Sequence, residues 1–396
     1  MKIAVIGVKG LPPKQGGIEH YCAEVYPRMV AQGHSVDLFA RSSYTDCSWL
    51  DRHDFQGVRV ISLPSLPLRG LDAFFSSAFG AIASSGTRYD IVHFHALGPS
   101  LFTWLPKIAS SAKVVVTCQG LDWQRAKWGS TSTRMIRMGE QAAVRFADGI
   151  TVVSKDLQSY FSNTYGRETL YIPNAPASYA ESDPTFSYGT SLGLQQGRYM
   201  LFLGRLVPEK RPDLLIEAFE ALKPDGWKLV FAGGVSDTKV YVSKLLDKVA
   251  KNPDVVFAGE LRGSRLAEIV RGAGLFTLPS DLEGLPLAML EAMQEGVPVL
   301  ANDIPPHQQL LDEQRGSLFK AGDVDSCVHS LDWAINNPQE VALMAQSAQK
   351  YVKTYYNWDH ITAENLKLYT TLTNSSTSLS TSNNISSRPT EIFGRK

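Results

Sequence analysis

Cysteine, net charge and long apolar runs are all scarce in this sequence, and each shortage excludes a class of protein. The 396 residues include four cysteines, too far apart for a disulfide framework or a C-x-x-C zinc site: Cys22, Cys47, Cys118 and Cys327. Lysine plus arginine equals aspartate plus glutamate, at 39 each, so nucleic acid is not expected as a main partner. No window reaches the roughly 18 apolar residues of a membrane span. This composition predicts a globular protein of the reducing cytoplasm.

The charges are unevenly divided along the chain. Residues 1–175 hold 18 lysines and arginines against 13 acids, a net charge of +5, and residues 176–396 hold 21 against 26, a net charge of −5. Opposite charges favour halves that face each other, and they give the first half a preference for an anionic acceptor or a membrane surface. We therefore expect peripheral contact with the inner face of the plasma membrane through the first half. Residues 71–85 come nearest to a membrane span, but their serines and glycine predict a buried or interfacial helix.

Short β-branched runs alternate with helical patterns, which is typical of doubly wound parallel α/β sheets. The first apolar run, residues 3–8, is too short for the core of a signal peptide and is expected to be a strand. Two Rossmann-like halves in series follow, and such sheets bind ligands at the carboxyl ends of their strands. The predicted strands are residues 2–7, 35–40, 91–95, 113–118 and 149–153 in the first half, and 199–204, 227–233, 255–258, 275–278 and 297–301 in the second.

A stretch rich in serine, proline, glycine and tyrosine separates the two halves. We expect a first domain over residues 1–175, a linker over 176–198 and a second domain over 199–350. A helix over 351–373 is expected to pack back on the first domain. Residues 374–396, rich in serine, threonine and asparagine, are expected to form a disordered tail.

Two glutamates, in Glu283-x7-Glu291, stand on either side of the expected start of a helix. Pro286 is typical of the first helical position and Gly296 of the position past the end, which predicts a helix from about residue 286 to residue 295. Glu291 then lies about 7.5 Å along the helix, and the backbone N–H groups of Gly284 and Leu285 belong to an anion site at its start. Carboxylates beside an anion site suit the hydroxyls of a nucleotide sugar. The alternative is two unrelated surface acids.

Cations follow the first strand of the second half, in Gly204-Arg205-x4-Lys210. This places Arg205 and Lys210 at the ligand-binding edge of the second sheet, where they can hold a diphosphate. When a nucleoside diphosphate leaves a sugar its negative charge grows, and fixed cations stabilise that charge. The alternative is a solvated basic loop.

A glycine-rich loop, residues 7–17, follows the first strand and includes Gly16 and Gly17. Its backbone can approach a phosphate or the reacting centre, or the loop can be a structural turn. The spacing is not G-x-G-x-x-G, and Ala40-Arg41 stands where a dinucleotide site would have an acid. A nicotinamide cofactor is therefore disfavoured.

Aromatic and charged residues follow the strand that ends at Cys118. The block suits sugar stacking and contact with an anionic acceptor such as a lipid diphosphate, although its tryptophans can instead pack between domains. His93 and His95 alternate along one strand, and His95, nearer the strand end, is the better cleft candidate. The candidate acceptor-binding residues are His95, Gln119, Asp122, Trp123, Arg125 and Lys127.

Other motifs are explained without catalysis. Asp323-x-Asp325 has the form of a metal motif but precedes a helical pattern, so helix capping is the expected role of Asp323. No Ser-His-Asp or Cys-His order indicates a hydrolase.

Together these residues resemble the family 4 retaining glycosyltransferases, which have the GT-B fold, two Rossmann-like domains facing each other across a cleft. Gly204-Arg205-x4-Lys210 is similar to the family's diphosphate loop and Glu283-x7-Glu291 to its acidic donor motif. The resemblance covers about residues 1–372. Residues 16–19 and 120–129 are most similar to a bacterial branch associated with rhamnosyl transfer in surface-polysaccharide assembly.

The resemblance implies a nucleotide diphosphate sugar as donor, held mainly by the second domain, a glycan or lipid-linked acceptor held by the first, and neither an essential metal nor another cofactor. Glu291 would bond the ribose hydroxyls and Glu283 the donor sugar. Arg205 and Lys210 would bind the diphosphate, and Gly17 would lie close to the donor.

One position departs from the family pattern. A histidine usually precedes the glycine at 120, and this chain has Gln119, which is a poor proton acceptor. Two other classes therefore stay open: another GT-B activity, such as an epimerase or phosphorylase, and a noncatalytic nucleotide-sugar sensor. An epimerase would consume donor without acceptor, whereas a sensor would bind the intact donor without turnover.

Overall fold

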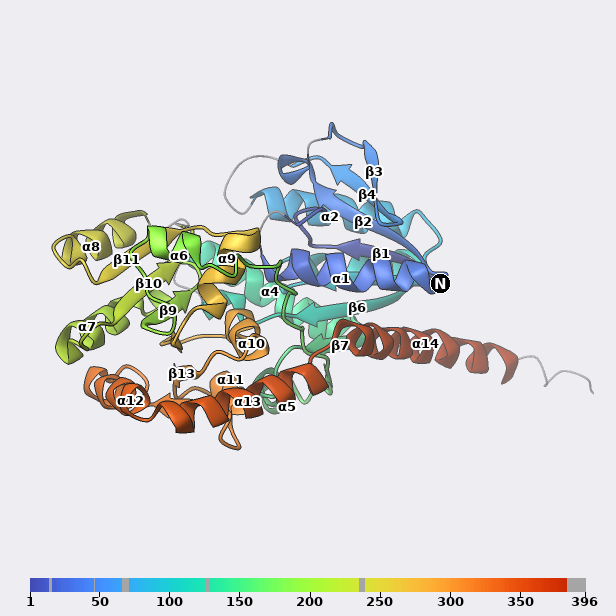
Figure 1. Ribbon diagram of the computed structural model, residues 1–396. Helices are drawn as coiled ribbons and strands as arrows, with labels where there is room; N and C mark the ends of the chain where they lie inside the picture. The colour runs from blue at the N-terminus through green and yellow to red at the C-terminus, as the bar shows by residue number, and fades with distance from the viewer. Residues whose placement is uncertain (14–15, 46, 66–70, 125–128, 235–238, 383–396) are drawn as a thin grey trace, which may run out of the picture.

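Two open sheets form the centres of two α/β domains in the computed structural model, which describes residues 1–13, 16–45, 47–65, 71–124, 129–234 and 239–382 (Figure 1). The first sheet has the order β3-β4-β2-β1-β5-β6-β7-β8 and the second the order β11-β10-β9-β12-β13-β14. All recorded strand pairs are parallel except β3 with β4. The architecture is the GT-B fold expected from the sequence.

The first domain is built from the following elements. Its strands are β1 (Lys2–Ile6), β2 (Ser35–Arg41), β3 (Arg52–Phe55), β4 (Val58–Leu63), β5 (Ile91–His95), β6 (Lys113–Cys118), β7 (Gly149–Val152) and β8 (Leu170–Tyr171). Its helices are α1 (Gly17–Ala31), α2 (Leu71–Ser85), α3 (Trp104–Ala109), α4 (Ser130–Phe146) and α5 (Lys155–Tyr165).

The second domain and the chain that leaves it are built as follows. The strands are β9 (Tyr199–Leu203), β10 (Lys228–Ala232), β11 (Val255–Gly259), β12 (Leu275–Leu278), β13 (Val299–Asn302) and β14 (Ser317–Phe319). The helices are α6 (Ser187–Ser191), α7 (Pro212–Leu222), α8 (Lys239–Val249), α9 (Gly263–Arg271), α10 (Leu287–Gln294), α11 (Pro305–Leu311), α12 (Val324–Asn336), α13 (Pro338–Tyr355) and α14 (Trp358–Ser382).

The central strands follow the predicted runs because they are buried on both faces. Every residue of β5 and of β12 is buried, and strands of this kind read as continuous apolar or β-branched runs. β5, β6 and β12 begin and end where the sequence predicts, and the other predicted strands shift by one or two residues.

The hairpin β3-β4 was not predicted. Its turn is Gln56-Gly57, and both residues have positive φ, 52° and 85°, as in the tight turns that join antiparallel strands. β3 lies at the edge of the sheet and reads Arg-His-Asp-Phe, so its sequence carries no apolar alternation that would reveal a strand.

The order of the second sheet creates a switch point between β9 and β12. These strands are neighbours, while the chain leaves β9 toward β10 on one side and β12 toward β13 on the other. The loops after both strands therefore meet at one edge, which is where open α/β sheets bind ligands. Arg205 and Lys210 follow β9, and Glu283 follows β12.

The linker differs from the expected span of residues 176–198. Its second part is built into the surface of the second domain: the Gly189 N–H donates to Glu268 Oε1 at 2.8 Å, and Phe186 stacks on Tyr199. The buried Phe186 explains why this part of the stretch is packed on the second domain. Its apolar ring is removed from solvent there, although the residues around it are rich in serine and glycine.

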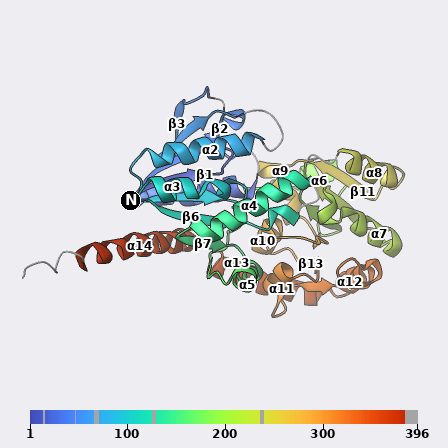
Figure 2. The same ribbon diagram turned by 180° about the vertical axis from the view of Figure 1, so that it is seen from behind.

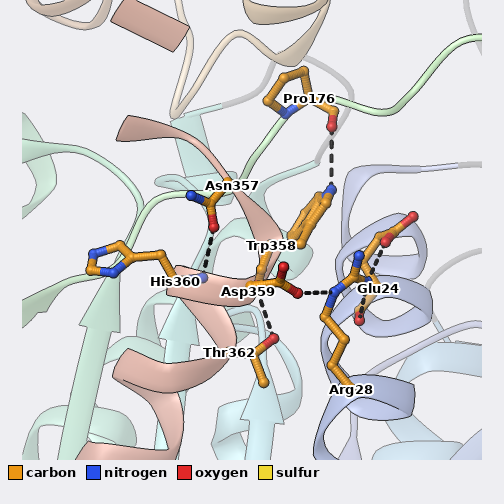
Figure 3. A network of polar contacts seen from close by, with 8 residues as sticks. All are labelled: Glu24, Arg28, Pro176, Asn357, Trp358, Asp359, His360 and Thr362. Carbon is orange, nitrogen blue, oxygen red and sulfur yellow. Dashed lines mark hydrogen bonds and ion pairs between the residues drawn. The ribbon is translucent and has the colours of Figure 1, made fainter. Parts of the chain in front are cut away.

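The chain returns to the first domain through α14, which packs against α1 and β6. The helical pattern breaks at Tyr356-Asn357, where the Asn357 side chain accepts from the His360 N–H at 2.8 Å (Figure 3). The Trp358 indole donates to the Pro176 carbonyl (Figure 3). The start of α14 is therefore hydrogen-bonded to the segment along which the chain first leaves the first domain.

α14 continues to Ser382, past the expected start of the tail at residue 374. In α14 before residue 374, threonines bond back to the preceding turn, for example Thr373 Oγ1 to the Tyr369 carbonyl at 2.9 Å, which satisfies hydroxyls inside a helix. Residues 383–396 lie outside the described part of the chain. Among the described helices, none combines the length and apolarity needed to cross a membrane.

Candidate functional site

A pocket lies at the switch point of the second sheet and is closed on one side by the first domain. Its position agrees with the expected binding edge of a doubly wound sheet. Four of the predicted donor-site residues line it, together with two backbone positions of the first domain. The lining residues are Gly120, Leu121, Arg205, Glu209, Lys210, Leu282, Glu283 and Gly284.

The loop after β9 is shaped so that Lys210 lies over the strand end. Gly204 has a φ of +155°, and a Cβ on it would stand 3.3 Å from Lys210 Cδ, so a glycine admits the lysine stem there. The Asp281 N–H donates to the Glu209 carbonyl at 2.9 Å. That bond joins the loops that follow β9 and β12, which fixes the cations relative to the acid.

Lys210 and Glu283 form an ion pair beside the pocket. The Lys210 ammonium donates to Glu283 Oε1 at 2.6 Å, and the two side chains are 16% and 12% exposed. Burial alone would raise the pKa of Glu283, but the charge and hydrogen bond of Lys210 outweigh burial and hold that pKa below its ordinary value. Glu283 is therefore a carboxylate at neutral pH, able to accept hydrogen bonds from hydroxyls.

Helix α10 begins four residues after Glu283. Pro286 is the N-cap residue with a ψ of 86°, one position before the helix, whereas the sequence predicted it as the first helical residue. Within the described residues, the N–H groups of Gly284, Leu285 and Leu287 have no recorded hydrogen-bond partner. Such groups at a helix start attract an anion.

The two domains approach each other closely at Gly284. A Cβ there would stand 2.2 Å from the Gln119 carbonyl oxygen, a distance that no side chain can occupy. The neighbouring Leu285 packs against two clusters of buried apolar side chains, one of which consists of first-domain residues such as Cys118. Leu285 therefore contributes apolar contact between the domains as well as a backbone N–H.

Gly17, at the start of α1, faces the start of α10. A Cβ on Gly17 would lie 3.0 Å from Leu287 Cδ1, and Gly16, with a φ of +101°, leaves room for the carboxylate of Glu19. The Lys9 N–H donates to that carboxylate at 3.1 Å. The glycine loop of the first domain thus lies across from the start of α10 in the second.

Glu291 lies one turn into α10, where its carboxylate meets the segment that joins the domains. The Tyr179 hydroxyl donates to Glu291 Oε2 at 2.7 Å. Burial raises the pKa of Glu291 to about 7, although the Tyr179 hydrogen bond acts in the opposite direction. Glu283 and Glu291 are thus held in different environments, one by a cation and one by a hydroxyl.

Two models of sugar-transferring enzymes match this chain in series. The model of the glycosyl transferase 4-like domain matches residues 16–175, and the model of the glycosyl transferases of group 1 matches residues 191–351. The second match contains the pocket cations and both glutamates. The chain belongs to the glycosyltransferases.

Curated relatives extend over nearly the whole of this glycosyltransferase. The D-inositol 3-phosphate glycosyltransferase of Gordonia bronchialis is 26% identical, over 93% of this chain and 88% of the relative. The enzyme of the same name from Mycolicibacterium paratuberculosis is 27% identical, over 93% of this chain and 90% of the relative.

Solved structures share the fold of this glycosyltransferase. Sucrose-phosphate synthase from Thermosynechococcus elongatus has a TM-score of 0.79 at 19% identity, over 94% of this chain and 99% of that one. The Anabaena protein HepE, solved in complex with UDP-glucose, has a TM-score of 0.74 at 20% identity, over 93% of this chain and 99% of that one.

His95, predicted to reach the cleft, does not do so in this glycosyltransferase. It is fully buried, its Nε2 lies 2.7 Å from the Tyr26 hydroxyl, and its ring stacks on His93. Burial lowers the pKa of His95 to about 3. The prediction was wrong because the partners of the imidazole come from α1, about 70 residues earlier in the sequence, and cover the strand end.

The other described acceptor candidates, Gln119, Asp122 and Trp123, follow the end of β6. Gln119 Oε1 accepts from Asn174 Nδ2 at 2.7 Å, so this amide is part of the junction with the linker. The Trp123 indole donates to the buried Glu140 at 2.8 Å, and the Arg137 guanidinium covers its ring at 4.1 Å. Asp122 is partly exposed beside Trp123. Arg125 and Lys127 lie outside the described residues.

Sequence reasoning missed a group of buried polar residues behind Glu283. His307 lies in α11, and its Nδ1 is 2.8 Å from the Asn302 carbonyl, so Nδ1 carries the hydrogen and Nε2 is an acceptor. Burial lowers the pKa of His307 to about 4, against the opposing charge of Glu283. In the sequence, two prolines at 305–306 followed by His307 indicate only the start of a helix. Nothing in this pattern indicates that Glu283 lies nearby.

No group of three or more His, Cys, Asp or Glu side chains in the described ranges is arranged to hold a metal ion. Asp323 caps α12, as predicted, by accepting from the Ser326 N–H at 3.0 Å.

Proposed function

We propose that this glycosyltransferase moves a hexosyl or deoxyhexosyl unit, rhamnosyl included, from a nucleotide diphosphate sugar to a glycan or lipid-linked acceptor in polysaccharide biosynthesis. The observation that carries the proposal is the Lys210 and Glu283 pair beside the open N–H groups of α10. A diphosphate needs the cation and the N–H groups, whereas a sugar needs the acid. The HepE complex shows that a protein of this fold, at 20% identity, binds UDP-glucose.

In the proposed donor complex the diphosphate lies between the basic loop and α10. Lys210 and Arg205 stabilise the charge that grows on the departing nucleoside diphosphate. Lys210 moves part of its hydrogen bonding from Glu283 to the phosphate, and Glu283 accepts from hydroxyls of the donor sugar. Glu291 accepts from the ribose hydroxyls.

The proposed reaction retains the configuration at the anomeric carbon. The acceptor oxygen bonds to that carbon on the face from which the phosphate oxygen leaves, and the acceptor proton passes to a phosphate oxygen. Gln119 cannot take the proton at neutral pH, and His95 is enclosed, so the leaving group is the base that the site offers. The proposed mechanism needs no metal.

The acceptor side of the proposal rests on the outer helices of the first domain. α2, α3 and α4 lie side by side over one face of the first sheet (Figure 2). Large apolar side chains project from all three, with exposed fractions from 41% to 72%. They are Phe79, Ile82, Trp104, Ile108 and Met138.

Exposed cations lie on α4, one of these three helices. α4 exposes Arg134, Arg137 and Arg145, and its one acid, Glu140, is buried and accepts from Trp123. Apolar and aromatic groups next to arginines suit an anionic membrane surface, where a lipid-linked acceptor would lie. The proposed place of action is thus the cytoplasmic face of the plasma membrane.

A donor screen tests the proposed chemistry. Thermal shift with UDP-glucose, GDP-mannose, ADP-glucose and dTDP-rhamnose selects a donor, and turnover is then measured with glycan and lipid-diphosphate acceptors. We expect acceptor-dependent release of the nucleoside diphosphate and a product of retained configuration by NMR. The relatives' acceptor, D-inositol 3-phosphate, belongs in the same screen. Donor consumption without acceptor would instead indicate an epimerase, and binding without turnover a sensor.

Vesicle binding tests the proposed acceptor side separately. We expect the protein to sediment with phosphatidylglycerol and phosphatidylcholine vesicles, and the triple variant Ile82→Ser, Trp104→Ser, Ile108→Ser to lose about tenfold in affinity. The control carries Val240→Ser and Leu343→Ser, which remove side chains that are 74% and 66% exposed on the second domain. Equal binding by both variants would overturn the membrane proposal.

A further inference from the structure

Tyr179 belongs to the segment that joins the two domains, yet its hydroxyl lies in the proposed donor site. It donates to Glu291 Oε2 at 2.7 Å, and both side chains are largely withdrawn from solvent. Glu291 comes from α10, 112 residues later in the sequence. A contact between a linker and the proposed ribose-binding acid is not needed for the fold of either sheet, so it calls for a functional explanation.

The backbone around Tyr179 is fastened on both sides, which gives the hydroxyl a fixed place. Before it, the Trp358 indole donates to the Pro176 carbonyl at 3.2 Å (Figure 3), and the Gln294 amide donates to the Ala177 carbonyl at 3.2 Å. After it, Arg271 donates to the Ala180 carbonyl at 2.9 Å. The backbone on both sides of Tyr179 is therefore held from α14, α10 and α9, which limits the positions that its hydroxyl can take.

We propose that Tyr179 is a positioning residue of the donor site, which holds the Glu291 carboxylate in one orientation for the ribose hydroxyls of the nucleotide. The inference rests on the proposed function, since it takes Glu291 as the ribose acceptor. A carboxylate has about four lone-pair sites, so one bond from Tyr179 leaves acceptor capacity for two neighbouring hydroxyls. An ionised acceptor also binds a hydroxyl about twice as strongly as a neutral one.

The electrostatics of the site make the hydroxyl necessary. Burial raises the pKa of Glu291 to about 7, and the Tyr179 hydrogen bond opposes that rise. The other charged groups that face Tyr179 are Glu295 and Arg271, which are paired with each other at 2.7 Å. Without the hydroxyl, a larger fraction of Glu291 would carry a proton at neutral pH, and the proton would occupy an acceptor site of the ribose.

The test removes the hydroxyl and keeps the ring. Binding of UDP, GDP and ADP to the full chain is measured by calorimetry, and the one that binds is compared with its 2′,3′-dideoxy form. Tyr179→Phe is expected to weaken binding of the ribonucleotide about tenfold and binding of the dideoxy form less than twofold, because only the ribonucleotide uses Glu291. The control is Tyr89→Phe, which removes a hydroxyl bonded to the Asp37 carboxylate at 2.6 Å in the first domain. It is expected to leave both affinities unchanged.

The pH dependence gives a readout that a merely structural role would not move. In the wild type, ribonucleotide affinity is expected to fall as the pH drops through about 7, the pKa of Glu291. In Tyr179→Phe that fall is expected to begin about half to one pH unit higher, because the stabilising hydrogen bond to the carboxylate is gone. The affinity of the dideoxy form is expected to show no such fall in either protein.

Each contrary result has a distinct meaning. Equal losses for the ribonucleotide and the dideoxy form would show that Tyr179 supports the fold alone, and unchanged binding with an unchanged pH profile would also overturn the inference. A wild type that binds none of the three nucleotides would overturn the proposed function itself. If Tyr179→Phe does not fold, the wild type is used to compare the ribonucleotide with its dideoxy form across pH. Ribonucleotide affinity that does not fall at acidic pH would contradict the role of Glu291 and with it the inference.

Discussion

The Lys210 ammonium lies 2.6 Å from Glu283 Oε1, where neither side chain is more than 16% exposed. Removal of one partner leaves the other charged and nearly buried, so Lys210→Met and Glu283→Gln are each expected to lower the free energy of unfolding by about 3 kcal/mol. The double variant Lys210→Met, Glu283→Gln is expected to recover much of this loss, because no unpaired charge remains. Urea unfolding of the four proteins measures the coupling. Additive losses in the double variant would contradict a buried pair.

Arg205 lines the same pocket, and we expect it to act in the transition state more than in the ground state. Arg205→Ala is expected to lower kcat about 10²- to 10³-fold and to change the donor KM little, since the charge it meets grows as the nucleoside diphosphate leaves. Steady-state kinetics with the donor identified by screening provide the measurement. Arg198→Ala removes an exposed cation at the opposite end of β9 and should leave kcat unchanged. A rise in KM with normal kcat would assign Arg205 to donor binding alone.

Gly284 faces the Gln119 carbonyl so closely that a Cβ would stand 2.2 Å from the oxygen. Gly284→Ala must therefore push the two domains apart or distort the start of α10, and either change moves the N–H groups from the diphosphate. We expect at least a tenfold loss of kcat/KM, because small misplacements at a reacting centre lower rates strongly. Gly98→Ala is the matched control, since a Cβ there meets nothing within 4 Å. Normal kinetics in Gly284→Ala would show that this approach is not needed for turnover.

The sequence was sufficient to place Arg205, Lys210 and Glu283 beside one pocket, because each of them is local to a strand end. Gly204, Arg205 and Lys210 follow one strand, and Glu283 follows the strand that pairs beside it, so position in the βα pattern alone brings them to one edge. In these loops Gly204, Gly284 and Pro286 indicate turns from residue type alone. Periodicity of apolar residues then sets the strands that carry them.

The same reasoning failed where side-chain partners are distant in sequence. Tyr179 and His307 carry no motif, and their relation to Glu291 and Glu283 arises only when the linker and α11 are packed. His95 is the reverse case, because a histidine near a strand end resembles a site residue until Tyr26 is placed over it. Burial and long-range hydrogen bonds determine whether such a residue belongs to a site or to the core, and neither can be read from a single sequence.

Glu291 should make stability depend on pH in a defined window. Its pKa is raised by burial to about 7 from an ordinary 4.5, so between these values the native state binds more protons than the unfolded state. The free energy of unfolding therefore falls as the pH rises through this window. Glu291→Gln is expected to gain stability relative to the wild type by about 3 kcal/mol between pH 4.5 and pH 7.5.

Urea unfolding of both proteins at several pH values measures this difference, and contributions of other groups, such as His307, cancel in it. Glu313→Gln, at a side chain that is 80% exposed, is expected to show no such trend. A constant difference between Glu291→Gln and the wild type across the window would contradict the raised pKa.

The Tyr369 hydroxyl connects α14 to the core of the first domain. It lies 2.6 Å from His93 Nδ1, and the Tyr26 hydroxyl lies 3.1 Å from the same nitrogen, in a group that is fully buried. Tyr369→Phe leaves the Tyr26 and His93 groups short of one partner, so it is expected to destabilise the protein by about 1–3 kcal/mol. It should also speed amide hydrogen exchange in α14, because that hydroxyl belongs to the network that joins the helix to β5. Tyr355→Phe, at a ring that is 60% exposed in α13, is the control and should change neither measurement. Faster exchange in α14 without global destabilisation would locate the effect at the docking of the helix, whereas unchanged exchange would show that apolar packing against α1 holds α14 without the network.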